Sequence, residues 1–103
     1  MDSCRPNEHP GHMESISVIV TGRVQGVGYR WFVHDLASSR GVSGWVRNRR
    51  DGAVEAELHG DQAQIDGILH AMHTGPPHAH VDGLEVREIL EGTTDGFEIR
   101  PTR

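Results

Sequence analysis

The sequence has no lysine and only one cysteine, Cys4. A lone cysteine cannot form a disulfide within the chain, and it cannot supply a structural zinc site by itself. Packing alone must therefore hold the fold together. Because the ten basic side chains are all arginines, a site for an anion would have to use guanidinium or backbone N–H groups.

Long apolar runs and an excess of positive charge are also absent. No apolar run approaches the roughly 18 residues of a membrane-spanning helix, and the first dozen residues hold no apolar stretch of the kind found in a signal peptide. The 15 acidic and 10 basic residues give a net charge of −5, which argues against binding to phosphate backbones. We therefore expect a cytoplasmic protein that binds neither membrane nor nucleic acid. We also expect it to be a monomer.

The length of 103 residues fits one domain. Residues 1–13 are polar, contain two prolines and show no periodicity, so we expect a flexible N-terminal extension there. The folded domain is expected over residues 14–103.

The first part of the domain follows the order strand, glycine loop, helix. From Ser15 apolar and polar residues alternate, which indicates a strand with one buried face. Residues 22–28, GRVQGVG, form a loop punctuated by glycine. Apolar residues then recur at helical spacing from Phe32 to Ala37, and Gly41 is the expected end of that helix.

The rest of the chain predicts a hairpin, a helix and two more strands. The hairpin strands are expected over residues 43–48 and 53–59, with Glu55, Glu57 and His59 on the outer face. The second helix is expected to begin after Asp61 as N-cap and to end at Gly75-Pro76-Pro77. The last strands are expected over residues 81–89 and 97–100.

This order, βαββαβ plus a short C-terminal strand, predicts an α+β fold. Its form is a ferredoxin-like split βαβ sandwich, with an antiparallel sheet and two helices on one face. The fold by itself does not determine a function.

The glycine loop is the first candidate site. A glycine turn between a strand and a helix N-terminus lets backbone N–H groups converge, and the helix dipole favours an anion there. Arg30, at the start of the helix, could bind two phosphate oxygens at once. The alternative is a tight connection without a ligand. Neither the Walker A motif nor the dinucleotide fingerprint GxGxxG is present.

Two segments resemble the signatures of the acylphosphatase family. The first is Gly22-Arg23-Val24-Gln25-Gly26-Val27-Gly28-Tyr29-Arg30, and the second is Gly44-Trp45-Val46-Arg47-Asn48, followed by Asp51-Gly52, Val54 and Gly60. The similarity extends from about Ser15 to Arg100. Tyr29 stands where phenylalanine is more usual, and Gly28 makes the loop more flexible.

The resemblance implies hydrolysis of acyl phosphates without metal or organic cofactor. It implies that Arg30 binds the phosphate and Asn48 positions the attacking water. It also implies a phosphate-binding loop that acts mainly through backbone N–H groups, made of Arg23, Val24, Gln25, Gly26 and Val27. Without the resemblance, a turn-forming role for Asn48 would be preferred.

Other features favour plain structural roles. The histidines at positions 70, 73, 78 and 80 could suggest zinc, but no carboxylate or thiol completes a set, so they are interpreted as surface residues. Phe32 and Trp45 are expected in the core or in the wall of the site. Arg47, Arg49 and Arg50 form a small basic patch that could steer an anionic substrate.

Two rival functions stay open from the sequence. One is a non-enzymatic ferredoxin-like binding module. The other is an acylphosphatase-like domain that acts on carbamoyl phosphate within a larger maturation enzyme, although we expect no further domain here. Hydrolysis of an acyl phosphate in the presence of a chelator would distinguish the enzyme from the binding module.

Overall fold

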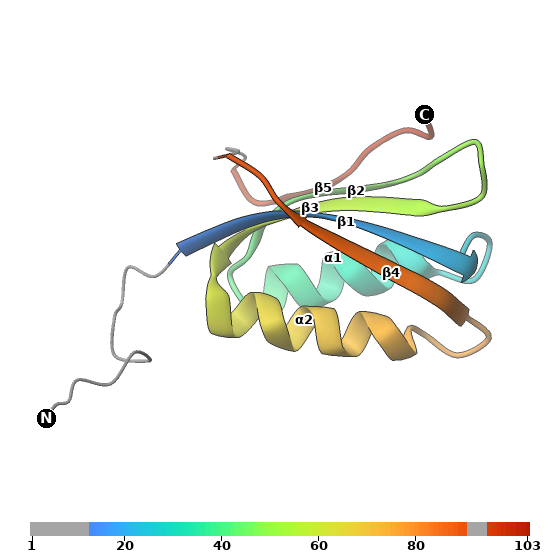
Figure 1. The fold of residues 1–103 in the computed structure, drawn as a ribbon, viewed down its shortest axis with the longest axis horizontal. Helices are drawn as coiled ribbons and strands as arrows, with labels where there is room; N and C mark the ends of the chain where they lie inside the picture. The colour runs from blue at the N-terminus through green and yellow to red at the C-terminus, as the bar shows by residue number, and fades with distance from the viewer. Residues whose placement is uncertain (1–12, 91–94) are drawn as a thin grey trace, which may run out of the picture.

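The computed structural model describes residues 13–90 and 95–103. Five strands form one sheet in the order β4-β1-β3-β2-β5 (Figure 1). The elements are β1 (Met13–Arg23), α1 (Tyr29–Ser39), β2 (Ser43–Asn48), β3 (Val54–Asp61), α2 (Gln62–Thr74), β4 (His80–Glu88) and β5 (Phe97–Ile99). Both helices cover the same face of the sheet (Figure 1), which confirms the predicted ferredoxin-like α+β fold.

The sheet is mixed, because its last strand runs parallel to its neighbour. β1 pairs antiparallel with β3 and β4, and β2 pairs antiparallel with β3. β5 pairs in parallel with β2, placing Phe97 opposite Gly44. The C-terminal strand thus adds a parallel pair to the otherwise antiparallel sheet.

The strand and helix limits differ little from those expected. Met13 and Glu14 already belong to β1, so the first strand begins before Ser15, and Met13 is not part of an extension. The other residues of the expected extension lie outside the described part of the chain. The Asp61 side chain accepts a hydrogen bond from the Ala63 N–H at 2.8 Å, which confirms the predicted N-cap of α2.

The apolar core lies between the sheet and the two helices. The predicted alternation in β1 is confirmed, since Ile16, Val18 and Val20 are all buried. They pack with buried residues of α1 and α2, among them Val33 and Ile68. Of the helices in the described residues, none is long and apolar enough to cross a membrane.

Two large side chains are buried on the other face of the sheet. Trp45 is opposite Glu57, whereas its neighbour Val46 points into the core, so Trp45 belongs to the face without helices. The guanidinium carbons of Arg47 and Arg100 lie 4.6 and 5.0 Å from the Trp45 ring centre. Two cationic side chains therefore cover Trp45, which is buried but lies outside the cluster between the sheet and the helices.

His59 also lies on this face, as predicted, but it is buried. Its Nδ1 is 3.0 Å from Ser15 Oγ on the adjacent strand. Its Nε2 is 3.4 Å from a carboxylate oxygen of Glu57, yet it forms no hydrogen bond with any described residue. Ser15 belongs to β1 and Glu57 to the same strand as His59, and the sequence pattern does not reveal these contacts.

Candidate active site

The loop between β1 and α1 is shaped by glycines. Gly26 and Gly28 have φ angles of 76° and 80°, a left-handed region that side-chain-bearing residues rarely adopt. Gly28 is the N-cap of α1, so no side chain caps the first turn of this helix. The helix N-terminus is therefore accessible to an external anion.

The backbone of this loop has unused hydrogen-bond donors. Within the described residues, no backbone carbonyl accepts a hydrogen bond from the consecutive N–H groups of Val24 to Gly28. The loop's own side chains are directed elsewhere: Val24 is buried in the core, and Val27 packs against it. Val24 and Val27 thus anchor the loop on the core, and its N–H groups have no backbone partner among the described residues.

Arg30 lies in the first turn of α1 and is half-buried. In the part of the chain that the structure describes, its guanidinium has no carboxylate partner and makes no side-chain hydrogen bond. Arg23, at the end of β1, is exposed and likewise has no ion-pair partner among these residues. The loop is therefore flanked by two guanidinium groups that form no ion pair with a described residue.

Asn48 is the last residue of β2. Its backbone is held by pairing with Val54 on β3 and by a 3.0 Å hydrogen bond from the Arg103 N–H to its carbonyl oxygen. Its side-chain Oδ1 is buried and has no hydrogen-bond partner among the described residues. A buried amide oxygen without a partner is costly, so this atom is a good candidate for binding a water molecule or a substrate group.

The side chain of Gln25 connects the loop to the β2–β3 turn, which directly follows Asn48. Its Nε2 donates hydrogen bonds to the carbonyl oxygens of Arg49 at 2.7 Å and Ala53 at 2.9 Å. In Figure 1 the β1–α1 loop and the β2–β3 turn lie at the same end of the sheet. The structure therefore brings Arg30, the glycine loop and Asn48 to one end of the domain. The resemblance implied mainly a backbone N–H role for Gln25, and no pattern in the sequence indicates these side-chain hydrogen bonds.

The basic patch on the hairpin is partly neutralised. Arg47 forms an ion pair with Glu55 at 2.9 Å, and Arg49 forms one with Asp51, also at 2.9 Å. Arg50 is exposed and makes no ion pair with a described residue. Of the predicted patch, Arg50 is the residue whose charge is free to attract an anion.

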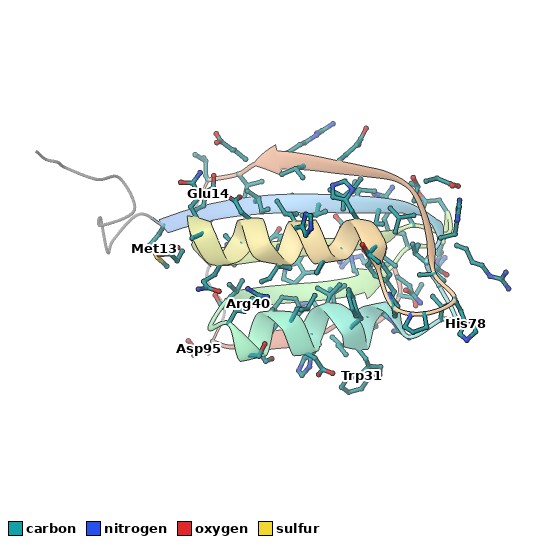
Figure 2. The ribbon with its side chains drawn as sticks, turned by 90° about the horizontal axis from the view of Figure 1, so that it is seen from below. Met13, Glu14, Trp31, Arg40, His78 and Asp95 are labelled. Carbon is teal, nitrogen blue, oxygen red and sulfur yellow. The ribbon has the colours of Figure 1, made fainter. Side chains whose placement is uncertain are left out.

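The histidines do not form a metal site in the described part of the chain. His70, His73, His78 and His80 are all exposed. Figure 2 shows His78 at the edge of the molecule, in the loop between α2 and β4. Among residues 13–90 and 95–103, no group of three or more histidine, cysteine or acidic side chains is placed to hold a metal ion.

A surface hollow of about 270 Å³ lies at the other end of α1 and β2. Ser38, Gly41, Val42, Ser43, Gly96 and Phe97 line it. None of these side chains is charged or can act as an acid or base near neutral pH, so the hollow offers little for catalysis. The end of the domain that carries Arg30 and Asn48 has the charged and amide groups that the hollow lacks.

The family assignment comes from comparison with known proteins. The acylphosphatase family model matches residues 16–99. The chain belongs to the acylphosphatase family. It is 42% identical over 90 residues to the acylphosphatase of Rhodospirillum rubrum, covering 87% of this chain and 99% of that protein.

Solved structures support the same assignment. An acylphosphatase from Coxiella burnetii superposes with a TM-score of 0.83 at 32% identity, covering 86% of this chain and 94% of that one. A full-length HypF, in a phosphate- and nucleotide-bound form, superposes with a TM-score of 0.81 at 26% identity. That match covers 87% of this chain but only 12% of HypF. The expected enzyme class, an acylphosphatase, is confirmed, and the non-enzymatic binding module is not favoured.

Proposed function

We propose that this enzyme hydrolyses the carboxyl–phosphate anhydride of small acyl phosphates, giving a carboxylate and inorganic phosphate. What supports the proposal is that the loop N–H groups, the Arg30 guanidinium and the Asn48 amide oxygen lie at the same end of the domain, each without a hydrogen-bond or ion-pair partner among the described residues. The first two suit a phosphoryl group, and the third suits a water molecule beside it.

In this proposal the N–H groups of residues 24–28 and the guanidinium of Arg30 bind the phosphoryl oxygens. Charge-assisted hydrogen bonds of this kind are about twice as strong as neutral ones. The positive end of the α1 dipole adds to them. Because negative charge on the phosphoryl oxygens has to be stabilised during transfer, these donors lower the barrier as well as bind the substrate.

Asn48 orients the attacking water. Its Oδ1 accepts a hydrogen bond from the water, whose oxygen then attacks phosphorus. The bond between phosphorus and the acyl oxygen breaks, and the carboxylate leaves with the electron pair. A neutral amide is too weak a base to take the proton, so a phosphoryl oxygen of the substrate receives it. A carboxylate needs no proton to leave, so this mechanism requires no general acid.

We propose that the enzyme is a monomer. Acyl phosphates are multiply charged and do not cross a lipid bilayer unaided, so the enzyme must share a compartment with its substrate. We propose the cytoplasm. Light scattering during gel filtration and cell fractionation test these two points.

The direct test is hydrolysis of benzoyl phosphate, followed by release of benzoate and inorganic phosphate. We expect stoichiometric products and competitive inhibition by inorganic phosphate, because phosphate occupies the same loop. Acetyl phosphate serves as a second substrate, and a phosphate monoester, whose leaving group is much poorer, serves as the negative control. Failure to hydrolyse either acyl phosphate would overturn the proposal.

A further inference from the structure

The Gln25 side chain uses both N–H bonds of its amide on the β2–β3 turn. The two acceptors are the carbonyl oxygens of Arg49 and Ala53, 24 and 28 residues away in sequence. Those residues begin and end the turn that follows Asn48. One side chain of the phosphate loop is therefore hydrogen-bonded to both sides of this turn.

The turn has its own internal hydrogen bonds. The Arg49 N–H donates to the Ala53 carbonyl at 2.8 Å, and the Gly52 N–H donates to the Arg49 carbonyl at 3.1 Å. The Asp51 side chain accepts from the Ala53 N–H at 3.0 Å and pairs with Arg49. Because these bonds already define the turn, the contribution of Gln25 is to fix the loop against it.

This connection matters because the two halves of the site lie on different elements. Asn48 is rigidly placed by its neighbours in the sheet, whereas the loop contains Gly26 and Gly28, whose backbones have wide conformational freedom. Among the described residues, Gln25 makes the side-chain hydrogen bonds that join residues 24–28 to the turn.

We propose that Gln25 is a positioning residue that sets the phosphate-binding loop in register with Asn48. The inference rests on the proposed function. Attack on phosphorus requires the water to lie opposite the leaving oxygen, and a misplacement of about 1 Å can cost roughly a hundredfold in rate. Gln25 acts on this alignment without touching the water or the reacting atoms.

The first test replaces the amide by a group of similar length without donors, Gln25→Met. We expect kcat for benzoyl phosphate to fall by about tenfold to a hundredfold. The inhibition constant for inorganic phosphate should change far less, since Arg30 and the loop N–H groups remain. Gln62→Met, at an exposed glutamine of α2 with no side-chain hydrogen bond to a described residue, is the matched control. Parental kcat in Gln25→Met would overturn the inference.

A double-mutant cycle with Asn48→Ala distinguishes loss of alignment between the loop and Asn48 from a general disturbance of the active site. If Gln25 works by aligning the loop with Asn48, Gln25→Met should cost much less in kcat when Asn48 is already alanine. Fully additive losses would show that Gln25 acts independently of Asn48 and would overturn the inference. If Asn48→Ala itself left kcat unchanged, the proposed water-orienting role would fail instead, so the two failures are distinguishable.

A second variant, Gln25→Glu, tests the inference through the pH dependence of kcat. This test is valid even if Gln25→Met does not fold. An ionised carboxylate facing two carbonyl oxygens has no donor, whereas a protonated carboxyl has one. Relative to the parent enzyme, the kcat of Gln25→Glu should therefore recover as the pH is lowered from about 7 to about 5. Gln62→Glu should keep the parental profile. A constant ratio of Gln25→Glu to parent across this range would count against the inference.

Discussion

The hydroxyl of Tyr29 donates a hydrogen bond to the backbone carbonyl oxygen of Met72 at a distance of 2.7 Å. Tyr29 is the first residue of α1, and Met72 lies in the last turn of α2. The last carbonyls of a helix have no partner within it, so Tyr29 satisfies one of them from another element. Burial raises the pKa of the Tyr29 hydroxyl well above its ordinary value, which keeps the donor proton in place.

Removing this hydroxyl should weaken the fold more than the chemistry. Tyr29→Phe keeps the ring but leaves a buried carbonyl without its partner, so we expect a loss of about 1–2 kcal/mol in the free energy of unfolding. For a domain of this size, each 1 kcal/mol corresponds to about 4–8 °C in Tm. Chemical denaturation and thermal melting measure the change, and kcat should stay close to that of the parent.

Trp31→Phe is the control for Tyr29→Phe. Trp31 is also an aromatic residue of the first turn of α1, but it is 62% exposed and projects from α1 at the edge of the molecule (Figure 2). Its replacement should leave the free energy of unfolding nearly unchanged. Equal losses in the two variants would show that the Tyr29 hydrogen bond contributes nothing specific.

Activity should persist after metal removal. The proposed mechanism takes its positive charge from Arg30 and from the loop N–H groups, and it assigns no step to a metal ion. Dialysis against EDTA, followed by assay in the presence of the chelator, should leave the rate of benzoyl phosphate hydrolysis at its initial value. Loss of activity that is restored by zinc or magnesium would contradict the mechanism.

Hydrophobic periodicity predicted the elements that pack on the core. The alternation that starts at Ser15 identified β1, in which Ile16, Val18 and Val20 are buried, and the helical spacing from Phe32 to Ala37 identified α1, in which Val33 and Ala37 are buried. These patterns are local, and burial of one face is enough to produce them. The start of β1 was missed because Met13 and Glu14 do not continue the alternation.

Contacts between distant segments could not be predicted in this way. The parallel pairing of β5 with β2 and the covering of Trp45 by two arginines depend on which strands become neighbours. The local pattern supplied the glycine loop and Arg30 as candidates, and the resemblance added Asn48 and a role for each residue. It did not supply the bonds of Gln25, because nothing in a single sequence indicates that its amide meets carbonyls in the next hairpin.

Arg30→Lys should not restore the function of the arginine, although it keeps the charge. A guanidinium donates two parallel hydrogen bonds to a phosphate, whereas an ammonium has different reach and geometry. We expect kcat/KM to fall roughly 30- to 150-fold, equivalent to a loss of about 2–3 kcal/mol. Arg40→Lys, at the opposite end of the molecule (Figure 2), is the matched control and should behave like the parent. A kcat/KM close to that of the parent in Arg30→Lys would mean that only the positive charge of Arg30 matters and that the paired hydrogen bonds of its guanidinium do not.

Asn48→Asp distinguishes a catalytic amide from a turn-forming residue. Aspartate matches asparagine in size and suits the same turns, so a purely structural role would tolerate it. If the amide orients water, the substitution places a negative charge beside an anionic substrate. We then expect kcat to fall by about a hundredfold or more, together with weaker binding of inorganic phosphate.

Asn48→Ala completes this prediction, because it removes the amide without adding charge. The backbone of Asn48 is held by Val54 and Arg103, so neither variant should lose the strand end, and thermal melts can verify this. In Asn48→Ala, kcat should fall while phosphate binding is largely kept, since Arg30 and the loop are untouched. The difference between the two variants in phosphate affinity then measures the repulsion introduced by aspartate. A folded Asn48→Asp enzyme with parental kcat would remove Asn48 from the mechanism.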